Sequence, residues 1–230
     1  MRITTLNLRG FFDWEHRMPL LVEYLRELAP DVLLLQEVVY LPEISPFSTV
    51  ELLNRGLLHP YRQEAITRLQ RGRRHEVYRE GLAVLSRLPV GASQTIALQH
   101  ETGDPHHRIV QLVDVVGEGG VWPLANVHLS VRDDFALTHL GEVLGMLRAK
   151  GEQRIVGGDF NVDHLEQHAE LWEDAVLTSS VQPYLSHPSS NENDDYFLVP
   201  TAYAIDRIQV SGDELSDHRA VTVDLSPRES

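Results

Sequence analysis

Carboxylate, amide and imidazole side chains recur in this chain at the ends of short apolar segments. Six separate segments supply them: Asn7; Glu37; Asn126 and His128; Asp159 and Asn161; Asp206; and Asp217 with His218. Any one of these alone is more often a turn former, a helix cap or a surface residue than a catalyst. Turn formers have no reason to recur as a mixture of Glu, Asp, Asn and His. As a set, these side chains could hold a hard divalent cation such as Mg²⁺ or Mn²⁺ and move protons near neutral pH.

The segments that must position these residues alternate between apolar strands and amphipathic helices. Helices are expected over residues 16–28, where apolar side chains recur at helical spacing, and over residues 134–150. Strands are expected over residues 2–8, 31–38, 82–85, 109–116, 121–129, 154–156, 205–210 and 220–225. Residues 117–120 fit a hairpin turn, and residues 186–195 fit a long surface loop. This alternation, with no linker or internal repeat, predicts one mixed α/β domain spanning residues 1–230.

Composition narrows the class of protein. The chain has 230 residues and no cysteine, which excludes thiolate metal sites and a cysteine nucleophile and fits a reducing compartment. No apolar run is long enough to span a bilayer, and the N-terminus is too polar for a signal peptide. A cytoplasmic monomer is therefore the expectation. The formal net charge of −14 argues against a generic DNA-binding protein, because such proteins usually present a basic surface.

A series of short motifs gives the chain a resemblance to a known family. In order, they are Thr5-Leu6-Asn7, Leu35-Gln36-Glu37-Val38, the segment 81–87, Asn126-Val127-His128-Leu129, Gly158-Asp159-Phe160-Asn161, Ile205-Asp206-Arg207-Ile208 and Ser216-Asp217-His218. Each string is weak alone, but the ordered set resembles the endonuclease/exonuclease/phosphatase superfamily over nearly the whole chain. The resemblance implies a four-layer α/β/β/α sandwich, in which two mixed β-sheets pack face to face with helices outside. It also implies a metal site at one end of the sandwich.

The resemblance further implies roles for the matching residues. Glu37 would be the principal ligand of Mg²⁺ or Mn²⁺, one ion or two, with support from Asn7, from Asp217 and, for a second ion, from Asp159. Asp159 and Asn161 would position an attacking water, and His218 would pair with Asp206. His128 would bind a phosphoryl oxygen or assist the leaving group. Arg108 and Asn126 are candidates for contacting the substrate, and the basic stretch from Arg68 to Arg79 is either a solvated loop or an arm that contacts phosphates.

These residue types suit hydrolysis of a phosphoester. A phosphodiester is anionic and repels hydroxide, so a hydrolase must neutralise charge on the phosphoryl oxygens. The expected function is therefore metal-dependent phosphoester hydrolysis, with a nuclease or DNA-repair phosphodiesterase as the first candidate. A hydrolase of a lipid, nucleotide or other small phosphoester is the alternative. A non-catalytic binding module on the same scaffold and a structural metal protein rank lower, because the candidate ligands and histidines are all present.

Overall fold

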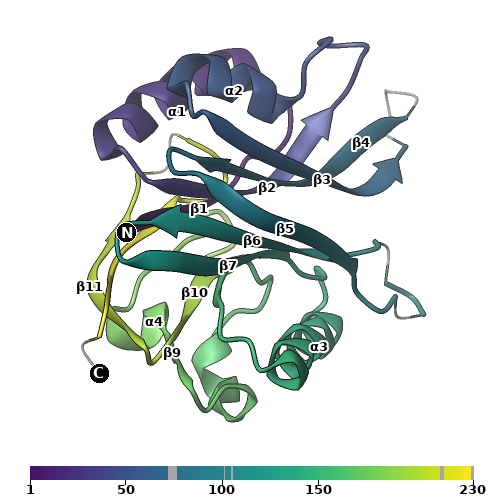
Figure 1. Cartoon of the computed structure of the whole chain (residues 1–230). Coiled ribbons are helices and arrows are strands. Elements are labelled where there is room, and N and C mark those ends of the chain that lie inside the picture. Colours follow the sequence, from purple (N-terminus) through teal and green to yellow (C-terminus); the bar gives the residue numbers. More distant parts are fainter. Residues whose placement is uncertain (72–76, 101, 105, 213–214, 229–230) are drawn as a thin grey trace.

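The computed structural model describes residues 1–71, 77–100, 102–104, 106–212 and 215–228. Within these residues, two six-stranded mixed sheets pack face to face (Figure 1). The first sheet has the spatial order β11 (Tyr203–Val210), β12 (Val221–Pro227), β1 (Arg2–Asn7), β2 (Val32–Tyr40), β4 (Tyr78–Ser86) and β3 (Tyr61–Gln70). The second has the order β5 (Val90–Ala97), β6 (Ile109–Gly117), β7 (Gly120–His128), β8 (Ile155–Asp159), β10 (Asp195–Pro200) and β9 (Ala175–Leu177).

Helices cover the outer face of each sheet. The first sheet carries α1 (Trp14–Leu28) and α2 (Thr49–Leu57). On the side of the second sheet lie α3 (Asp133–Lys150), the short 3₁₀ helix η1 (Leu165–Leu171) and α4 (Thr178–Val181). This arrangement confirms the predicted four-layer α/β/β/α sandwich. None of the described helices combines the length and the hydrophobicity that crossing a bilayer requires.

The apolar run of β2 shows how the layers are held together. Its alternate side chains point to opposite faces, so Leu33 and Leu35 pack under α1 and α2, whereas Val32 and Leu34 enter the core between the sheets. All four side chains are fully buried. A strand covered on both faces needs apolar residues at every position, which is why this segment reads as a continuous run.

The predicted helices and strands are confirmed, and the sequence missed α2, β3, β5, η1, β9, α4 and β10. The strands β3 and β5 lie at sheet edges and are largely exposed, so they lack the apolar pattern that identifies a buried strand. The predicted surface loop over residues 186–195 is only partly right. Ser186, Asp194 and Asp195 are buried, and Asp195 begins β10.

Candidate active site

The candidate site lies at one end of the sandwich, where the two sheets meet. Strands β1 and β2 run parallel in the first sheet, and β7 and β8 run parallel in the second, so each pair delivers its carboxyl ends to one edge. Asn7 ends β1, whereas His128 and Asp159 end β7 and β8. The Asn7 amide nitrogen donates a hydrogen bond of 2.9 Å to the Asp159 carboxylate, which joins the two sheets at this edge. These strand ends therefore meet at one edge of the sandwich.

Two glycines allow Asp159 to reach this position. A Cβ on Gly157 would lie 2.4 Å from the Phe197 ring, and one on Gly158 would lie 2.0 Å from the Val127 carbonyl oxygen. Gly158 also has a φ of 150°, which side-chain-bearing residues rarely adopt. The Gly-Gly pair therefore lets β8 pack closely against β7 and β10 just before the carboxylate.

Asp159 is the central acceptor of the site. Its Oδ2 lies 3.5 Å from His128 Nε2, and its Oδ1 accepts a 3.0 Å hydrogen bond from the backbone N–H of Asn161. Burial raises the pKa of Asp159 above its ordinary value; the negative charge of Asp195 adds to this, and the positive charge of His218 opposes it. Burial, reinforced by the positive charge of Arg108, lowers the pKa of His128 well below its ordinary value, so this ring is neutral at pH 7.

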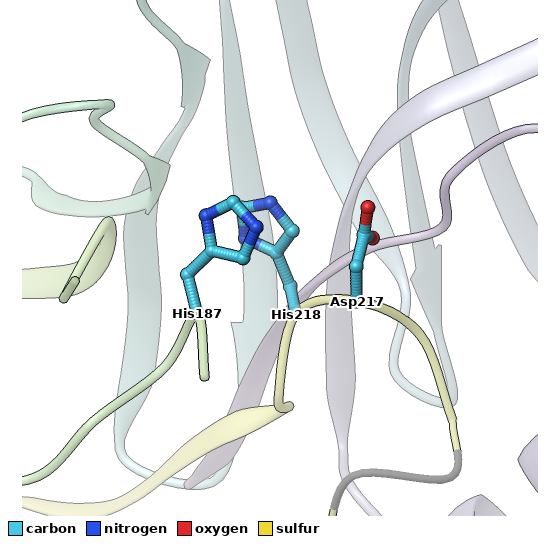
Figure 2. Close-up of side chains that lie close together, drawn as sticks. All are labelled: His187, Asp217 and His218. Carbon is cyan, nitrogen blue, oxygen red and sulfur yellow. The ribbon is translucent and has the colours of Figure 1, made fainter. Parts of the chain in front are cut away.

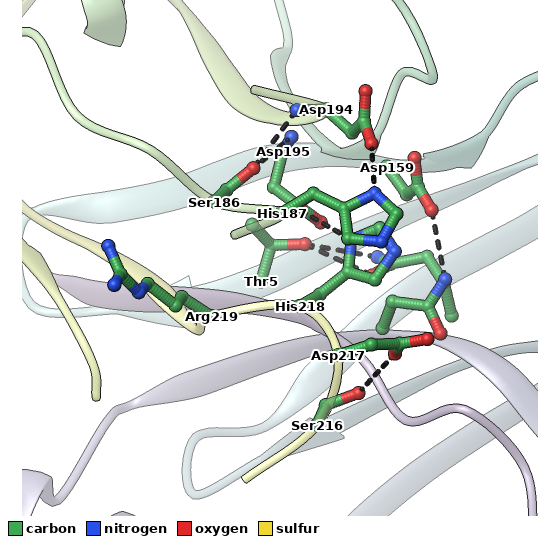
Figure 3. A network of polar contacts seen from close by, with 12 residues as sticks. Thr5, Asp159, Ser186, His187, Asp194, Asp195, Ser216, Asp217, His218 and Arg219 are labelled. Atoms are coloured by element: carbon green, nitrogen blue, oxygen red, sulfur yellow. Dashed lines mark hydrogen bonds and ion pairs between the residues drawn. The ribbon is translucent and has the colours of Figure 1, made fainter. Parts of the chain in front are cut away.

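The carboxylate partner of His218 is Asp195, and the predicted partner Asp206 is wrong. His218 Nδ1 lies 2.8 Å from Asp195 Oδ2, and both side chains are buried (Figure 3). Burial by itself would lower the pKa of His218, but the charges of Asp195 and Asp159 outweigh it and raise the pKa far above its ordinary value. Asp206 is exposed on β11, at a bulge, where its carboxylate accepts a 3.0 Å hydrogen bond from Ser226.

The sequence does contain a signal for Asp195, although residues 186–195 were expected to form a surface loop. Asp195 directly precedes Tyr196–Val199, a short apolar run, just as Glu37 and Asp159 adjoin apolar strands. The acidic residues before it made the segment look like a solvated loop. Asp195 pairs with Asp159 in the antiparallel register of β10 and β8, and this register brings the two carboxylates together.

Glu37 reaches the site from a bulge in β2. The register between β2 and β4 shifts between Leu35 and Val38, and Glu37 has a φ of 47°, an uncommon conformation for a residue with a side chain. Burial and the negative charges of Glu80 and Asp159 raise the pKa of Glu37 to about 7. Carboxylates gathered this closely repel one another, and a bound divalent cation would relieve that repulsion.

Several donor atoms at the site fit a hard divalent cation. Among the described residues, three groups of side chains place their ligand atoms within 4.8 Å of one another: Asp159, Asp195 and His218; His187, Glu192 and Asp194; and His187, Asp217 and His218, the last of which is drawn in Figure 2. The buried Asp195 Oδ1 accepts no hydrogen bond from any described residue, which leaves a carboxylate oxygen available. Glu37 and Asn7 lie outside these groups. The Asp217 carboxylate accepts a 3.0 Å bond from Ser216 and forms a 2.9 Å ion pair with Arg9.

Asn126 was predicted to contact substrate, but the structure gives it another role. It is fully buried one step deeper than His128 on the same face of β7. Its amide nitrogen donates to the carbonyl oxygens of Leu35 (3.3 Å) and Ala83 (3.1 Å), beside the bulge of β2, and its Oδ1 accepts a 2.8 Å bond from Gln36. Asn126 therefore ties the second sheet to the segment that presents Glu37 and cannot reach a substrate.

Replacing Asn126 by alanine should lower the free energy of unfolding by about 2 kcal/mol, because buried carbonyl groups would lose their donor. Urea denaturation of Asn126→Ala, beside the exposed β5 variant Gln94→Ala as control, measures this loss. Equal stability of the two variants would contradict the structural role.

Arg108 is a buried cation with free donors. It is 2% exposed, and its Nε and Nη2 have no hydrogen-bond partner in the described part of the chain. Burial, with the positive charge of Arg68, lowers its pKa to about 10, so it stays charged at neutral pH. Arg68 itself is largely buried and pairs with Glu80 at 2.5 Å. A buried guanidinium with unpaired donors beside His128 and Asp159 suits an anionic ligand.

Residues 72–76 of the basic stretch lie outside the described residues.

The sequence also missed His187. This ring stacks on His218 with centroids 4.3 Å apart and an interplanar angle of 18°. Its Nδ1 lies 2.7 Å from Asp194 Oδ2. Nothing in the local sequence marks His187, because it sits in a loop and meets the site only through the tertiary fold. The remaining predicted residue, Asn161, follows Asp159 with a φ of 50° and donates from its amide to the Leu129 carbonyl oxygen at 3.2 Å.

The chain is thus a two-sheet sandwich, and one end of it is lined by carboxylates, paired histidines and a buried arginine. The chain matches the model of the Endonuclease/Exonuclease/phosphatase family over residues 4–218 and belongs to that family. Members of this family are in general hydrolases that act on phosphoesters and depend on divalent metals. The predicted family membership is therefore confirmed.

Solved structures share the fold at low sequence identity. An endonuclease/exonuclease/phosphatase from Beutenbergia cavernae is 20% identical with a TM-score of 0.78, covering 99% of this chain and 71% of that one. The human Nocturnin catalytic domain with bound sulfate anion is 19% identical with a TM-score of 0.74, covering 99% and 94%. D. rerio TDP2 complexed with single strand DNA product is 17% identical with a TM-score of 0.72, covering 98% of each chain. A comparison with curated proteins found no match.

Proposed function

We propose that this protein is a Mg²⁺- or Mn²⁺-dependent phosphoester hydrolase that cleaves a phosphodiester by attack of water. The main support for the proposal is that three kinds of functional group lie together at one end of the sandwich. Carboxylates with raised pKa values surround Asp159, a His–Asp pair stands beside them, and Arg108 offers unpaired donors. Phosphoester hydrolysis requires a bound cation, a group that moves a proton and a group that binds the anionic substrate, and these side chains can provide all three.

Glu37 would hold the divalent cation, with Asn7 and the carboxylates of Asp159 and Asp217 as further oxygen donors. When bound, the cation supplies charge neutralisation for the phosphoryl oxygens and for the leaving oxygen. The raised pKa of Glu37 supports this role, since a cation favours the ionised form of a carboxylate that burial otherwise disfavours.

The protein side chains would bind and orient the substrate. Asp159, which accepts hydrogen bonds from Asn7 and from the Asn161 N–H, would orient the attacking water and accept its proton. Asp195 keeps His218 protonated and fixes its ring, so that Nε2 can donate to a phosphoryl oxygen as negative charge grows there. Arg108 would bind a second phosphoryl oxygen, and the neutral His128 would lie beside it, 3.5 Å from Asp159.

For the substrate, we favour single-stranded nucleic acid over a lipid, a nucleotide or another small phosphoester. Phe12 is 60% exposed, and the Arg9 guanidinium lies 4.0 Å from its ring centroid. Arg9 also pairs with Asp217 at the site. Phe12 is therefore an exposed aromatic ring one contact away from Asp217, and a base can stack on such a ring. TDP2, which shares the fold, has been solved with a single strand DNA product.

Phe12→Ala should weaken binding of a short single-stranded oligonucleotide about tenfold, because stacking on an aromatic ring contributes on the order of 1–3 kcal/mol per base. The rate at which Phe12→Ala hydrolyses bis-p-nitrophenyl phosphate should stay within about twofold of wild type, since this small ester has no base to stack on Phe12. Fluorescence anisotropy with a labelled oligonucleotide measures the first effect. Unchanged oligonucleotide affinity would instead favour a small phosphoester.

The proposed activity is tested with bis-p-nitrophenyl phosphate and with single-stranded oligonucleotides, in Mg²⁺, Mn²⁺ and EDTA. We expect turnover with either metal, none in EDTA, and none from Glu37→Ala under any condition. Metal-independent turnover, or an active Glu37→Ala variant, would rule out the proposal. Absence of turnover with both kinds of ester, together with tight ligand binding, would favour a binding module.

A further inference from the structure

Two imidazole rings are held in the same way at the site, and the proposed reaction uses one of them. His187 and His218 stack at 4.3 Å with planes 18° apart (Figures 2 and 3). Each ring meets the carboxylate of one of two consecutive residues through its Nδ1: His187 meets Asp194 at 2.7 Å, and His218 meets Asp195 at 2.8 Å. Holding two loop residues in a stacked pair, each fixed by a carboxylate, costs conformational entropy. This cost points to a function for His187.

Both rings lie close to the Asp217 carboxylate. Since each Nδ1 is engaged, the Nε2 atoms are the ones left for a ligand, and no described residue hydrogen-bonds to His187 Nε2. Donor nitrogens of both rings and a carboxylate oxygen of Asp217 lie within 4.8 Å of one another. The His187 side chain is 22% exposed, so a ligand can reach it.

The stacking decides which part of a phosphoester His187 can contact. In phosphoryl transfer the attacking and leaving oxygens lie roughly in line, on opposite sides of phosphorus. Two near-parallel rings 4.3 Å apart approach phosphorus from the same side. They cannot serve as a base and an acid across that line. They can, however, contact two non-bridging oxygens of one phosphoryl group.

We infer that His187 and His218 form a two-imidazole clamp on the non-bridging oxygens of the scissile phosphoryl group, in which Asp194 is the positioning residue for His187. This inference rests on the proposed function and assigns a substrate-binding residue to the same site. Asp194 accepts from Nδ1 and so fixes the His187 ring with its Nε2 left to contact a phosphoryl oxygen. The backbone N–H of Asp194 donates a 3.0 Å hydrogen bond to the Ser186 hydroxyl oxygen, which helps to hold Asp194 in place.

The first test separates a clamp from a leaving-group acid. With His187→Ala, kcat/KM should fall about tenfold to a hundredfold, the loss expected for one hydrogen bond to a charged group. The fall in kcat/KM should be equal for bis-p-nitrophenyl phosphate and for an alkyl phosphodiester. The two esters differ in their leaving groups, and the clamp contacts only the non-bridging oxygens. A loss confined to the alkyl ester, whose leaving oxygen needs a proton, would overturn the clamp. The exposed α1 variant His16→Ala is the control.

The second test does not depend on turnover. Calorimetric titration of inorganic phosphate, with Mg²⁺ present, should give a dissociation constant about tenfold higher for His187→Ala than for wild type. His187→Gln, whose amide can reach the position of Nε2, should recover part of the affinity. Asp194→Asn should weaken binding less than His187→Ala and add nothing to it in the double variant.

These outcomes keep the clamp and the hydrolase distinguishable. Phosphate affinity that depends on His187 in a protein without turnover would retain the clamp and reject the hydrolase. Turnover with phosphate affinity unchanged in His187→Ala would reject the clamp alone, as would a wild-type protein that binds no phosphate at millimolar concentration. Thermal melting of each variant checks that the fold is intact.

Discussion

Asp195→Asn should lower kcat about a thousandfold, within the usual range for a group that governs a proton at the reacting centre. Asparagine keeps the size of the side chain but removes the charge that holds His218 protonated and oriented. Asp206→Asn should stay within about twofold of wild type, because Asp206 is exposed and bonds only to Ser226 among the described residues. Steady-state kinetics with bis-p-nitrophenyl phosphate measures both.

A double variant shows whether Asp195 acts through His218. If it does, Asp195→Asn combined with His218→Ala should be no slower than His218→Ala alone, because residues that work as a unit are strongly non-additive. Multiplicative losses would mean that Asp195 acts separately, for instance as a metal ligand. A large loss in Asp206→Asn would restore the pairing that the motif suggested. Circular dichroism establishes that the buried substitution leaves the fold intact.

Glu37→Gln should lower affinity for Mn²⁺ and metal-dependent turnover at least about a hundredfold, because it removes the charged donor of the proposed cation site. Calorimetry with Mn²⁺ measures the affinity directly. Glu23→Gln, an exposed substitution on α1, is the matched control and should behave as wild type. Unchanged Mn²⁺ affinity in Glu37→Gln would remove Glu37 from the site.

The same residue predicts how stability of the metal-free protein depends on pH. The pKa of Glu37 is about 7 in the folded protein, above its ordinary value of 4.5. Between these values the folded protein keeps a proton that the unfolded chain has lost, so stability decreases as pH rises through this interval. In EDTA, the melting temperature of wild type should fall more steeply from pH 5 to pH 8 than that of Glu37→Gln. Added Mn²⁺ should reverse the fall in wild type alone.

Much of the fold could be predicted because the central strands are covered on both sides. The run of apolar residues in β2 and the Gly-Gly-Asp end of β8 mark buried strands and the polar groups that follow them. Edge strands such as β3 could not be found in this way, since their exposed faces carry no apolar pattern. The sequence thus locates the centre of the sandwich more readily than its rims.

The site could be predicted only as far as single strands determine it. Asn7, His128 and His218 lie near Asp159, as does Glu37, but the expected Asp206 lies elsewhere, exposed on β11. Which aspartate pairs with His218 depends on the register between β10 and β8, a long-range feature that a short motif does not encode. Alternation along β7 puts Asn126 on the same face as His128, two residues apart. It could not tell that Asn126 lies one step too deep for a substrate.

A crystal structure of the protein soaked with Mn²⁺, with anomalous diffraction to locate the ion, tests the central claim most directly. We expect an anomalous peak within about 2.5 Å of a Glu37 carboxylate oxygen, between the two sheets and on the side of Asp159 and His218. A peak bound only to surface carboxylates, or side chains of Glu37, Asp159 and His218 turned to different faces, would contradict a shared metal site at the end of the sandwich.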